Sequence, residues 1–209
     1  MELGVDGIEV DIFKCNSGEL VVFHDQSLKR LSGNVSYIEN LKLDSIRKIN
    51  LEGNHKIPTL IEVLDLINGK VLLNIELKGT QTAKETNELI NFYLNNDENW
   101  TTEKFIISSF NWNELNEFYN LNKQVPIAVL TDGDPLDAIP IAKQLNAKAI
   151  NPKYESLNEN NVKKIHSSGY KIYPYTINSK NDIIKMVNLK VDGIITDYPE
   201  RVNNVIKSF

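Results

Sequence analysis

Cysteine is almost absent from the sequence: Cys15 is the only one, so no internal disulfide can form. We expect a fold that does not depend on oxidation, and a cytoplasmic location. A run of about 20 apolar residues, which a helix needs to cross a bilayer, is also missing, so we expect no stable membrane insertion. The opening residues, Met-Glu-Leu-Gly-Val-Asp-Gly, lack the basic and then apolar stretch of a signal peptide.

Basic residues are in the minority. The chain has 23 Lys and Arg residues against 28 Asp and Glu residues, which gives a net charge of −5. Proteins that bind nucleic acid usually present a basic face, so this balance argues against a nucleic-acid partner. An anionic small molecule would need a local cation in its binding site.

The rest of the composition is that of an ordinary globular protein, with 41% hydrophobic and 24% charged residues in a chain of 209. Short segments rich in β-branched residues alternate with longer segments of helical periodicity, which is typical of repeated βα units around a parallel sheet. We expect one domain over residues 1–209, with strands at residues 6–12, 19–23, 71–78, 104–110, 126–131, 147–152, 171–177 and 192–197. Helices are expected at residues 59–67, 82–94, 112–121, 135–144, 159–167, 180–188 and 199–207.

This α/β pattern favours a TIM-type (β/α)8 barrel, but the first two strands depart from it. Only residues 13–18 connect them, and parallel neighbours need a crossover of about a dozen residues or more. We therefore expect an antiparallel hairpin with its turn at Asn16-Ser17-Gly18, and its second strand outside the barrel. Seven parallel strands then remain, so the barrel is expected to lack its first βα unit. Residues 25–58 are polar and are expected to form a small excursion over the barrel mouth, with a weak helix at 43–50.

Two strands carry polar residues at alternate positions, which places these side chains on one face of each strand. Glu9 and Asp11 share a face of the first strand; Asn74, Glu76 and Lys78 share a face of the strand at 71–78, where the lysine can serve an anionic substrate. Inside a barrel, three carboxylates would repel unless a divalent cation or protonation relieved them. Oxygen ligands suit Ca²⁺ or Mg²⁺, and zinc is disfavoured because thiolates and paired imidazoles are absent. An equal alternative is a set of exposed carboxylates on a sheet edge.

His24 follows the apolar run Leu20-Val21-Val22-Phe23, so its imidazole is expected beside the strand that carries the two carboxylates. Histidine suits general acid–base catalysis because its ordinary pKa of about 6.5 lies near the working pH. The alternative is a surface or capping residue. His55 and His166 have no carboxylate constellation nearby and are assigned to solvent, and Cys15 in its turn is taken as incidental.

Several short segments form an ordered set along nearly the whole chain. They are Gly4-Val5-Asp6-Gly7-Ile8-Glu9-Val10-Asp11, Gly18 to His24-Asp25, Ile57-Pro58-Thr59-Leu60, Asn74-Ile75-Glu76-Leu77-Lys78, Ser108-Ser109-Phe110, Tyr175-Thr176-Ile177-Asn178 and Thr196-Asp197-Tyr198-Pro199. In this order and spacing they resemble the glycerophosphodiester phosphodiesterase family. The resemblance implies a TIM barrel that uses one divalent cation, Ca²⁺ or Mg²⁺, to hydrolyse small glycerophosphodiesters to glycerol 3-phosphate and an alcohol.

The resemblance also implies site roles, and one family feature is missing. The implied positions are the metal ligands Glu9, Asp11 and Glu76, the catalytic His24, the phosphate-contacting Lys78, and Phe110 and Tyr175, which line the substrate pocket. Family members begin with a strand ending in His-Arg-Gly, which supplies another catalytic histidine and a phosphate-binding arginine; nothing here corresponds to it. We expect the chain to be an N-terminally shortened version of a longer gene product, with Met1 an internal methionine or a misplaced start, and this form to be nearly inactive.

Two other functions are compatible with these residues. One is a non-catalytic, degenerate barrel that binds a phosphodiester or a protein. The other is an enzyme similar to phosphatidylinositol-specific phospholipase C, which shares the barrel and the pair of carboxylates, although no membrane-inserting apolar loop is visible. The sequence leaves the alcohol leaving group, the metal and the oligomeric state open.

Overall fold

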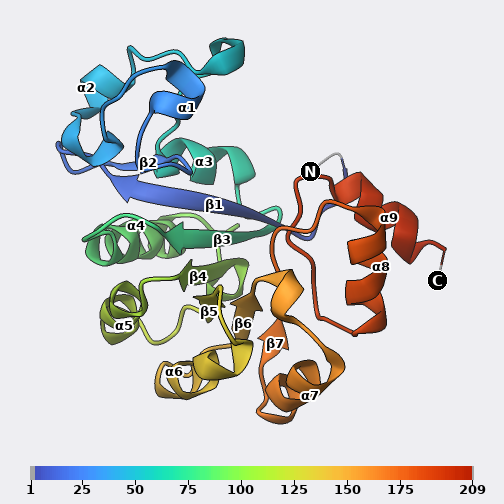
Figure 1. The fold of residues 1–209 in the computed structure, drawn as a ribbon. Helices are drawn as coiled ribbons and strands as arrows, with labels where there is room; N and C mark the ends of the chain where they lie inside the picture. The colour runs from blue at the N-terminus through green and yellow to red at the C-terminus, as the bar shows by residue number, and fades with distance from the viewer. Residues whose placement is uncertain (1–2, 209) are drawn as a thin grey trace. The chain divides into compact units, whose positions relative to one another are not determined.

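The structure, a computed structural model, describes residues 3–208 (Figure 1). The chain forms two compact units, one made of residues 7–125 and the other of residues 3–6 and 126–208. Both alternate strands with helices, and nearly all of their strand pairs are parallel, which confirms the expected α/β class. No helix among the described residues has both the length and the apolar character needed to cross a bilayer.

The first unit contains four strands in the order β2-β1-β3-β4. Their bounds are β1 Gly7–Lys14, β2 Leu20–Val22, β3 Leu72–Leu77 and β4 Phe105–Ser109. The pairs β1–β3 and β3–β4 are parallel, whereas β1 and β2 are antiparallel, with Phe13 opposite Val21. The predicted hairpin is therefore confirmed. Its turn closes through Gly18, whose φ of 103° favours glycine, and whose N–H donates to the carbonyl of Cys15.

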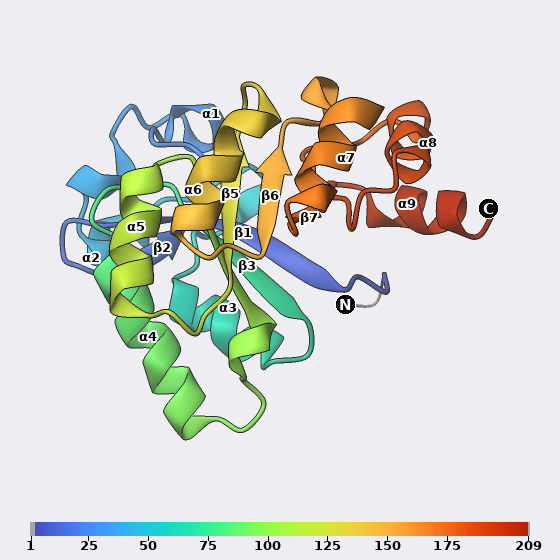
Figure 2. The ribbon, with the colours of Figure 1, turned by 90° about the horizontal axis from the view of Figure 1, so that it is seen from below.

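Three main helices accompany these strands: α3 (Leu60–Ile67), α4 (Ala83–Asn96) and α5 (Trp112–Leu121). The helix α3 begins at a capping box, in which Thr59 and Glu62 each satisfy a backbone N–H of the other. Helices α4 and α5 lie side by side (Figure 2). The apolar residues of β3, Leu73, Ile75 and Leu77, are fully buried, so the alternate polar positions project from the opposite face. A short 3-10 turn, η3 (Thr102–Lys104), leads into β4.

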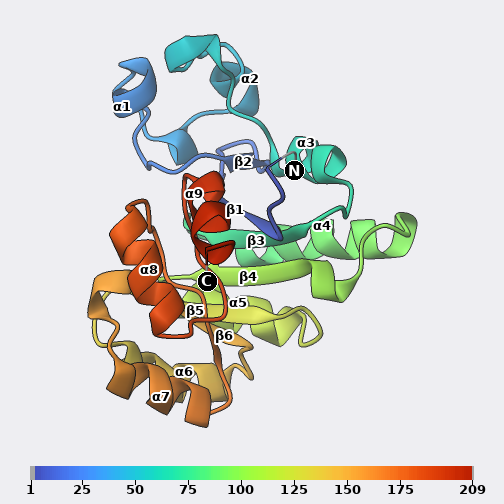
Figure 3. The same ribbon diagram turned by 90° about the vertical axis from the view of Figure 1, so that its right-hand side faces the viewer.

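The second unit has three parallel strands, β5 (Ile127–Thr131), β6 (Ala149–Pro152) and β7 (Lys171–Ile172). Its helices are η4 (Pro135–Asp137), α6 (Ala138–Gln144), η5 (Tyr154–Ser156), α7 (Glu159–Ser167), α8 (Lys180–Asn188) and α9 (Pro199–Ile206). Helices α8 and α9 pack against each other (Figure 3). The helix predicted at 135–144 is thus a 3-10 turn followed by an α-helix.

The prediction of a regular strand at residues 192–197 is wrong, and β7 is shorter than expected. The segment still follows the end of β7: the N–H groups of Asp192 and Ile195 donate to the carbonyls of Ile172 and Pro174, and Ile177 donates to Ile195. Proline has no N–H, so the ladder is interrupted at Pro174 and neither segment continues as a regular strand.

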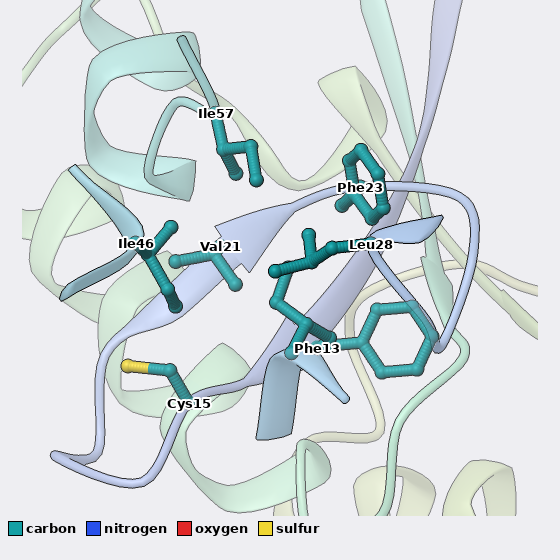
Figure 4. Close-up of a cluster of buried hydrophobic side chains, with 8 residues drawn as sticks. Phe13, Cys15, Val21, Phe23, Leu28, Ile46 and Ile57 are labelled. Atoms are coloured by element: carbon teal, nitrogen blue, oxygen red, sulfur yellow. The ribbon is translucent and has the colours of Figure 1, made fainter. Parts of the chain in front are cut away.

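Residues 25–58 fold over a small hydrophobic cluster that they share with the hairpin. They contain α1 (Lys29–Ser32), η1 (Ile38–Asn40), α2 (Leu43–Ile46) and η2 (Glu52–Asn54), so the weak helix expected at 43–50 is a single turn. The cluster joins side chains of the hairpin to side chains of this excursion (Figure 4); its buried members are Phe13, Cys15, Val21, Phe23, Leu28, Ile38, Ile46 and Ile57. The excursion is therefore anchored to β1 and β2 by apolar packing rather than lying loosely over them.

Candidate active site

The structure brings the three predicted carboxylates together. Glu9 and Asp11 project from one face of β1, and the register pairs Asp11 with Glu76 on β3. One carboxylate oxygen of each residue lies within 4.8 Å of those of the other two. The prediction of a single carboxylate cluster is confirmed, and all three residues belong to the same unit.

Burial makes this cluster electrostatically unfavourable without a cation. Glu76 is only 7% exposed. Burial, followed by the negative charge of Asp11, raises the pKa of Glu9 from 4.5 to about 8 and that of Glu76 from 4.5 to about 7. At neutral pH, a positive charge among these groups would therefore favour their ionised forms.

The residues present fit a hard divalent cation. The Oε1 atom of Glu9 is buried and has no hydrogen-bond partner, and the same holds for Oδ1 of Asn74, the residue paired with Glu9 in the register of β1 and β3. Buried oxygen atoms rarely lack a partner, so these two atoms indicate a missing donor or cation. A set of carboxylate oxygens is the donor chemistry that Ca²⁺ and Mg²⁺ prefer.

Lys78 supplies the cation present within the cluster. Its Nζ lies 2.9 Å from Oδ1 of Asp11 and 3.7 Å from Oε1 of Glu76. This confirms that the lysine shares the polar face of β3 with Glu76. Since an ammonium group has three donors, Lys78 can hold a carboxylate and still donate to an anionic ligand.

His24 follows the hairpin strand, as expected, and its imidazole is held by its neighbour. The N–H of Phe23 donates to the carbonyl of Asp11 at 3.0 Å, so the hairpin brings the chain back to β1 just before His24. The side chain of His24 is 65% exposed, and its Nδ1 lies 2.6 Å from Oδ1 of Asp25. Asp25 in turn accepts from Nε of Arg30 at 2.6 Å and from Nη2 at 3.1 Å, and this hydrogen bonding lowers the pKa of Asp25 to about 2.

The pair formed by Asp25 and Arg30 was not anticipated from the sequence. The only local signal is the adjacency of histidine and aspartate, and the arginine five residues later carries none. An ionised Asp25 fixes the orientation of the imidazole through Nδ1 and leaves Nε2 available for proton transfer.

The two predicted pocket aromatics lie in different units. Phe110 follows β4 in the unit that holds the carboxylates and is 43% exposed. Tyr175 lies in the other unit, where its hydroxyl donates to the carbonyl of Thr131 at 3.0 Å.

One of the histidines assigned to solvent has a specific partner. Nε2 of His166 lies 2.9 Å from Oδ2 of Asp192, whose same oxygen accepts from the N–H of Ile172. His166 lies in an exposed position, as expected, and the end of α7 also brings its ring against Asp192. His55 lies in an exposed position, as expected.

Comparisons with known proteins show the family to which the chain belongs. Residues 1–201 match the glycerophosphoryl diester phosphodiesterase family. A glycerophosphodiester phosphodiesterase of Caldanaerobacter subterraneus is 31% identical over 99% of this chain and 88% of its own length. Another from Bacillus subtilis is 26% identical over 100% of this chain and 79% of its own length.

Solved structures show the same fold. A phosphodiesterase of Oleispira antarctica, in complex with the product sn-glycerol-3-phosphate, has a TM-score of 0.87 at 24% identity and covers 99% of this chain and 87% of its own. A glycerophosphodiester phosphodiesterase of Thermotoga maritima has a TM-score of 0.75 at 23% identity, with the same coverage of 99% and 87%. The match in sequence and fold extends over nearly the whole chain, and the chain belongs to the glycerophosphoryl diester phosphodiesterase family.

Proposed function

We propose that this protein hydrolyses glycerophosphodiesters to glycerol 3-phosphate and an alcohol, with the help of one divalent cation, Ca²⁺ or Mg²⁺. The observation that carries the proposal is the cluster of the half-buried Glu9 and Asp11 and the buried Glu76, with Lys78 beside it. The product bound to the phosphodiesterase of Oleispira antarctica supports the choice of substrate class. Family membership favours this reaction over that of a phosphatidylinositol-specific phospholipase C.

The cluster residues have distinct roles in this proposal. Glu9, Asp11 and Glu76 hold the cation, which when bound neutralises charge on the phosphoryl oxygens. Lys78 donates to a phosphate oxygen from a position already fixed by Asp11. In this proposal, the positive charge stabilises the negative charge that the phosphoryl group gains in the transition state.

His24 moves a proton in the proposed reaction. Asp25 engages Nδ1, so Nε2 is the nitrogen that exchanges a proton with the substrate or with water. Phe110, which belongs to the unit that holds the carboxylates, is proposed to line the substrate pocket.

We also propose that the fold is a TIM-type barrel in which this chain lacks the first βα unit, with β2 outside the barrel. The sequence holds three histidines, and only His24 is joined by the hairpin to the strand of the carboxylates. An in-line displacement requires both an acid and a base, so the 209 residues alone are expected to turn over slowly. A strand ending in His-Arg-Gly would add the second group.

The experiment compares the 209-residue chain with one extended by such a strand, taken from a family relative. Release of glycerol 3-phosphate from glycerophosphocholine is followed with and without chelator. We expect metal-dependent turnover by the extended chain, and turnover lower by about 10²–10⁴-fold by the 209-residue chain.

Only one of the three histidines follows the hairpin that carries Glu9 and Asp11, which also favours a second candidate, a non-catalytic protein that binds phosphodiesters. A folded extended chain that binds substrate without turning it over would support this candidate. Turnover that is insensitive to chelator would contradict the metal-dependent reaction.

A further inference from the structure

In the loop formed by residues 78–83, every backbone N–H group donates a hydrogen bond. The N–H groups of Lys78 and Gly79 donate to the carbonyl of Ile12, at 3.3 Å and 3.0 Å. That of Thr80 donates to Glu39 at 3.1 Å, and those of the next three residues, 81–83, donate to Glu114 at 2.7–3.2 Å. No N–H group in residues 78–83 is left for an anionic substrate, so this loop can contact the substrate only through side chains, of which Lys78 lies at the carboxylate cluster.

Glu39 connects this loop to the one that follows His24. Its Oε1 accepts from the N–H of Thr80 at 3.1 Å and from the hydroxyl of Thr80 at 3.2 Å. Its Oε2 accepts from Nε2 of Gln26 at 3.4 Å. Thr80 lies two residues after Lys78, and Gln26 lies two residues after His24. One carboxylate therefore bridges the segments that carry two of the proposed functional residues.

The position of Glu39 is fixed by its surroundings. The neighbouring Ile38 is fully buried in the cluster of the excursion, and its N–H donates to the carbonyl of Gln26 at 2.9 Å. Gly79 permits a close approach: a Cβ there would lie 2.9 Å from Cδ1 of Phe13 and 3.1 Å from Oε1 of Glu39. The carboxylate is thus seated against a backbone position that has no room for a larger residue.

We infer that Glu39 is a positioning residue for the proposed hydrolysis, acting through Lys78 and His24 without touching the substrate. The inference rests on the proposed function. Without this carboxylate, Thr80 and Gln26 lose their common partner, and the separation between the two loops is no longer set by a side chain. A small displacement of groups that bind or transfer a proton to the substrate lowers affinity and rate even when the fold is intact.

The test uses the 209-residue chain with saturating Mg²⁺ and measures the affinity for sn-glycerol 3-phosphate by calorimetry. The variants are Glu39→Gln, Lys78→Met and the double variant. The matched control is Glu52→Gln, which changes an exposed glutamate of the same excursion. We expect Glu39→Gln to weaken product binding by about fivefold or more, with Mg²⁺ affinity and thermal stability close to those of the unmodified chain and of the control.

The double variant separates positioning from a general structural effect. If Glu39 acts through Lys78, Glu39→Gln should have little further effect on product affinity once Lys78 is replaced by methionine. A merely structural role would weaken product binding equally with and without Lys78, and that result would overturn the inference. The inference would also be overturned if Glu39→Gln bound the product within twofold of the unmodified chain.

Hydrogen exchange distinguishes failure of the inference from failure of the proposed function. We expect Glu39→Gln to raise amide exchange in residues 24–27 and at Thr80 together, because glutamine has a single acceptor oxygen, which cannot accept from both Thr80 and Gln26 as the carboxylate does. If the unmodified chain binds no glycerol 3-phosphate, the proposed function fails. Increased exchange in both segments of Glu39→Gln would then still support the contact that Glu39 makes between the two loops. Unchanged exchange would reject that contact as well.

Discussion

Glu9 is the residue whose charge state depends most directly on what the site binds. Its raised pKa means that the folded protein holds a proton that the unfolded chain has released between pH 4.5 and about 8, and Glu76 behaves in the same way up to about pH 7. In this interval the native state binds more protons than the unfolded state. The stability contributed by these groups is therefore present at low pH and is lost as the pH rises.

We predict that the metal-free protein loses stability between pH 5 and pH 8, by up to about 1.4 kcal/mol per pH unit for each proton involved. Saturating Mg²⁺ should remove most of this dependence, because the ionised carboxylates then have a partner. Thermal unfolding with EDTA and with Mg²⁺ across this range checks it. The variant Glu9→Gln should show a shallower slope in EDTA, and an identical slope would contradict the assignment.

Mutations in the carboxylate cluster and at His24 should affect metal affinity and activity differently. Glu76→Ala is expected to weaken the affinity for Mg²⁺ or Ca²⁺ by at least about tenfold and to lower activity with it, because a ligand is lost. His24→Ala is expected to lower activity in the extended chain by about 10²–10⁴-fold while metal affinity stays nearly unchanged. Calorimetric metal titration and the glycerol 3-phosphate assay decide this, and a parallel loss of metal affinity in His24→Ala would assign the imidazole to ligation instead.

At the scale of the element, the N-terminus of α4 is capped by a side chain from α5. The carboxylate of Glu114, itself buried, accepts from the N–H groups of residues 81–83 and from the hydroxyl of Thr82. These are the N–H groups that a helix start leaves without a partner, and a negative charge there also interacts favourably with the helix dipole.

We predict that Glu114→Ala destabilises the protein by about 1–3 kcal/mol, since it leaves buried N–H groups without a partner. Urea unfolding measures the change, and Glu117→Ala is the control, an exposed glutamate on the same helix. Equal stability of the two variants would show that water replaces this cap.

The sequence predicted the elements well where the signals are local. The bounds of α5, α7 and α8 follow from helical periodicity, and the carboxylate cluster follows from alternation along β1 and β3. The contacts that Glu39 and Glu114 make with the loop after β3 could not be predicted, because they join residues 31 to 41 positions apart in the sequence. The predicted end of β7 is wrong because Pro174 has no N–H to continue the ladder, although the residues around it have the apolar pattern of a strand.

At the scale of the whole molecule, we expect a strand added ahead of β1 to stabilise the protein as well as to supply a histidine. The strand β2 pairs with β1 only at Ile12, Phe13 and Lys14, so β2 does not cover the start of β1. Covering a sheet edge satisfies backbone groups and removes a site of aggregation. The extended chain should show a higher Tm and less aggregation than the 209-residue chain, and equal values would argue against pairing of that strand with the start of β1.

Because Cys15 lies in the cluster beneath the excursion, opening of the excursion can be measured without introducing a reporter residue by mutation. The thiol is 2% exposed within the apolar cluster, and it is the only one in the sequence. A thiol reagent can therefore reach it only when that cluster opens, so the labelling rate reports the free energy of local opening. Comparing this rate with the rate of global unfolding would show whether the excursion detaches from the hairpin as a separate cooperative unit.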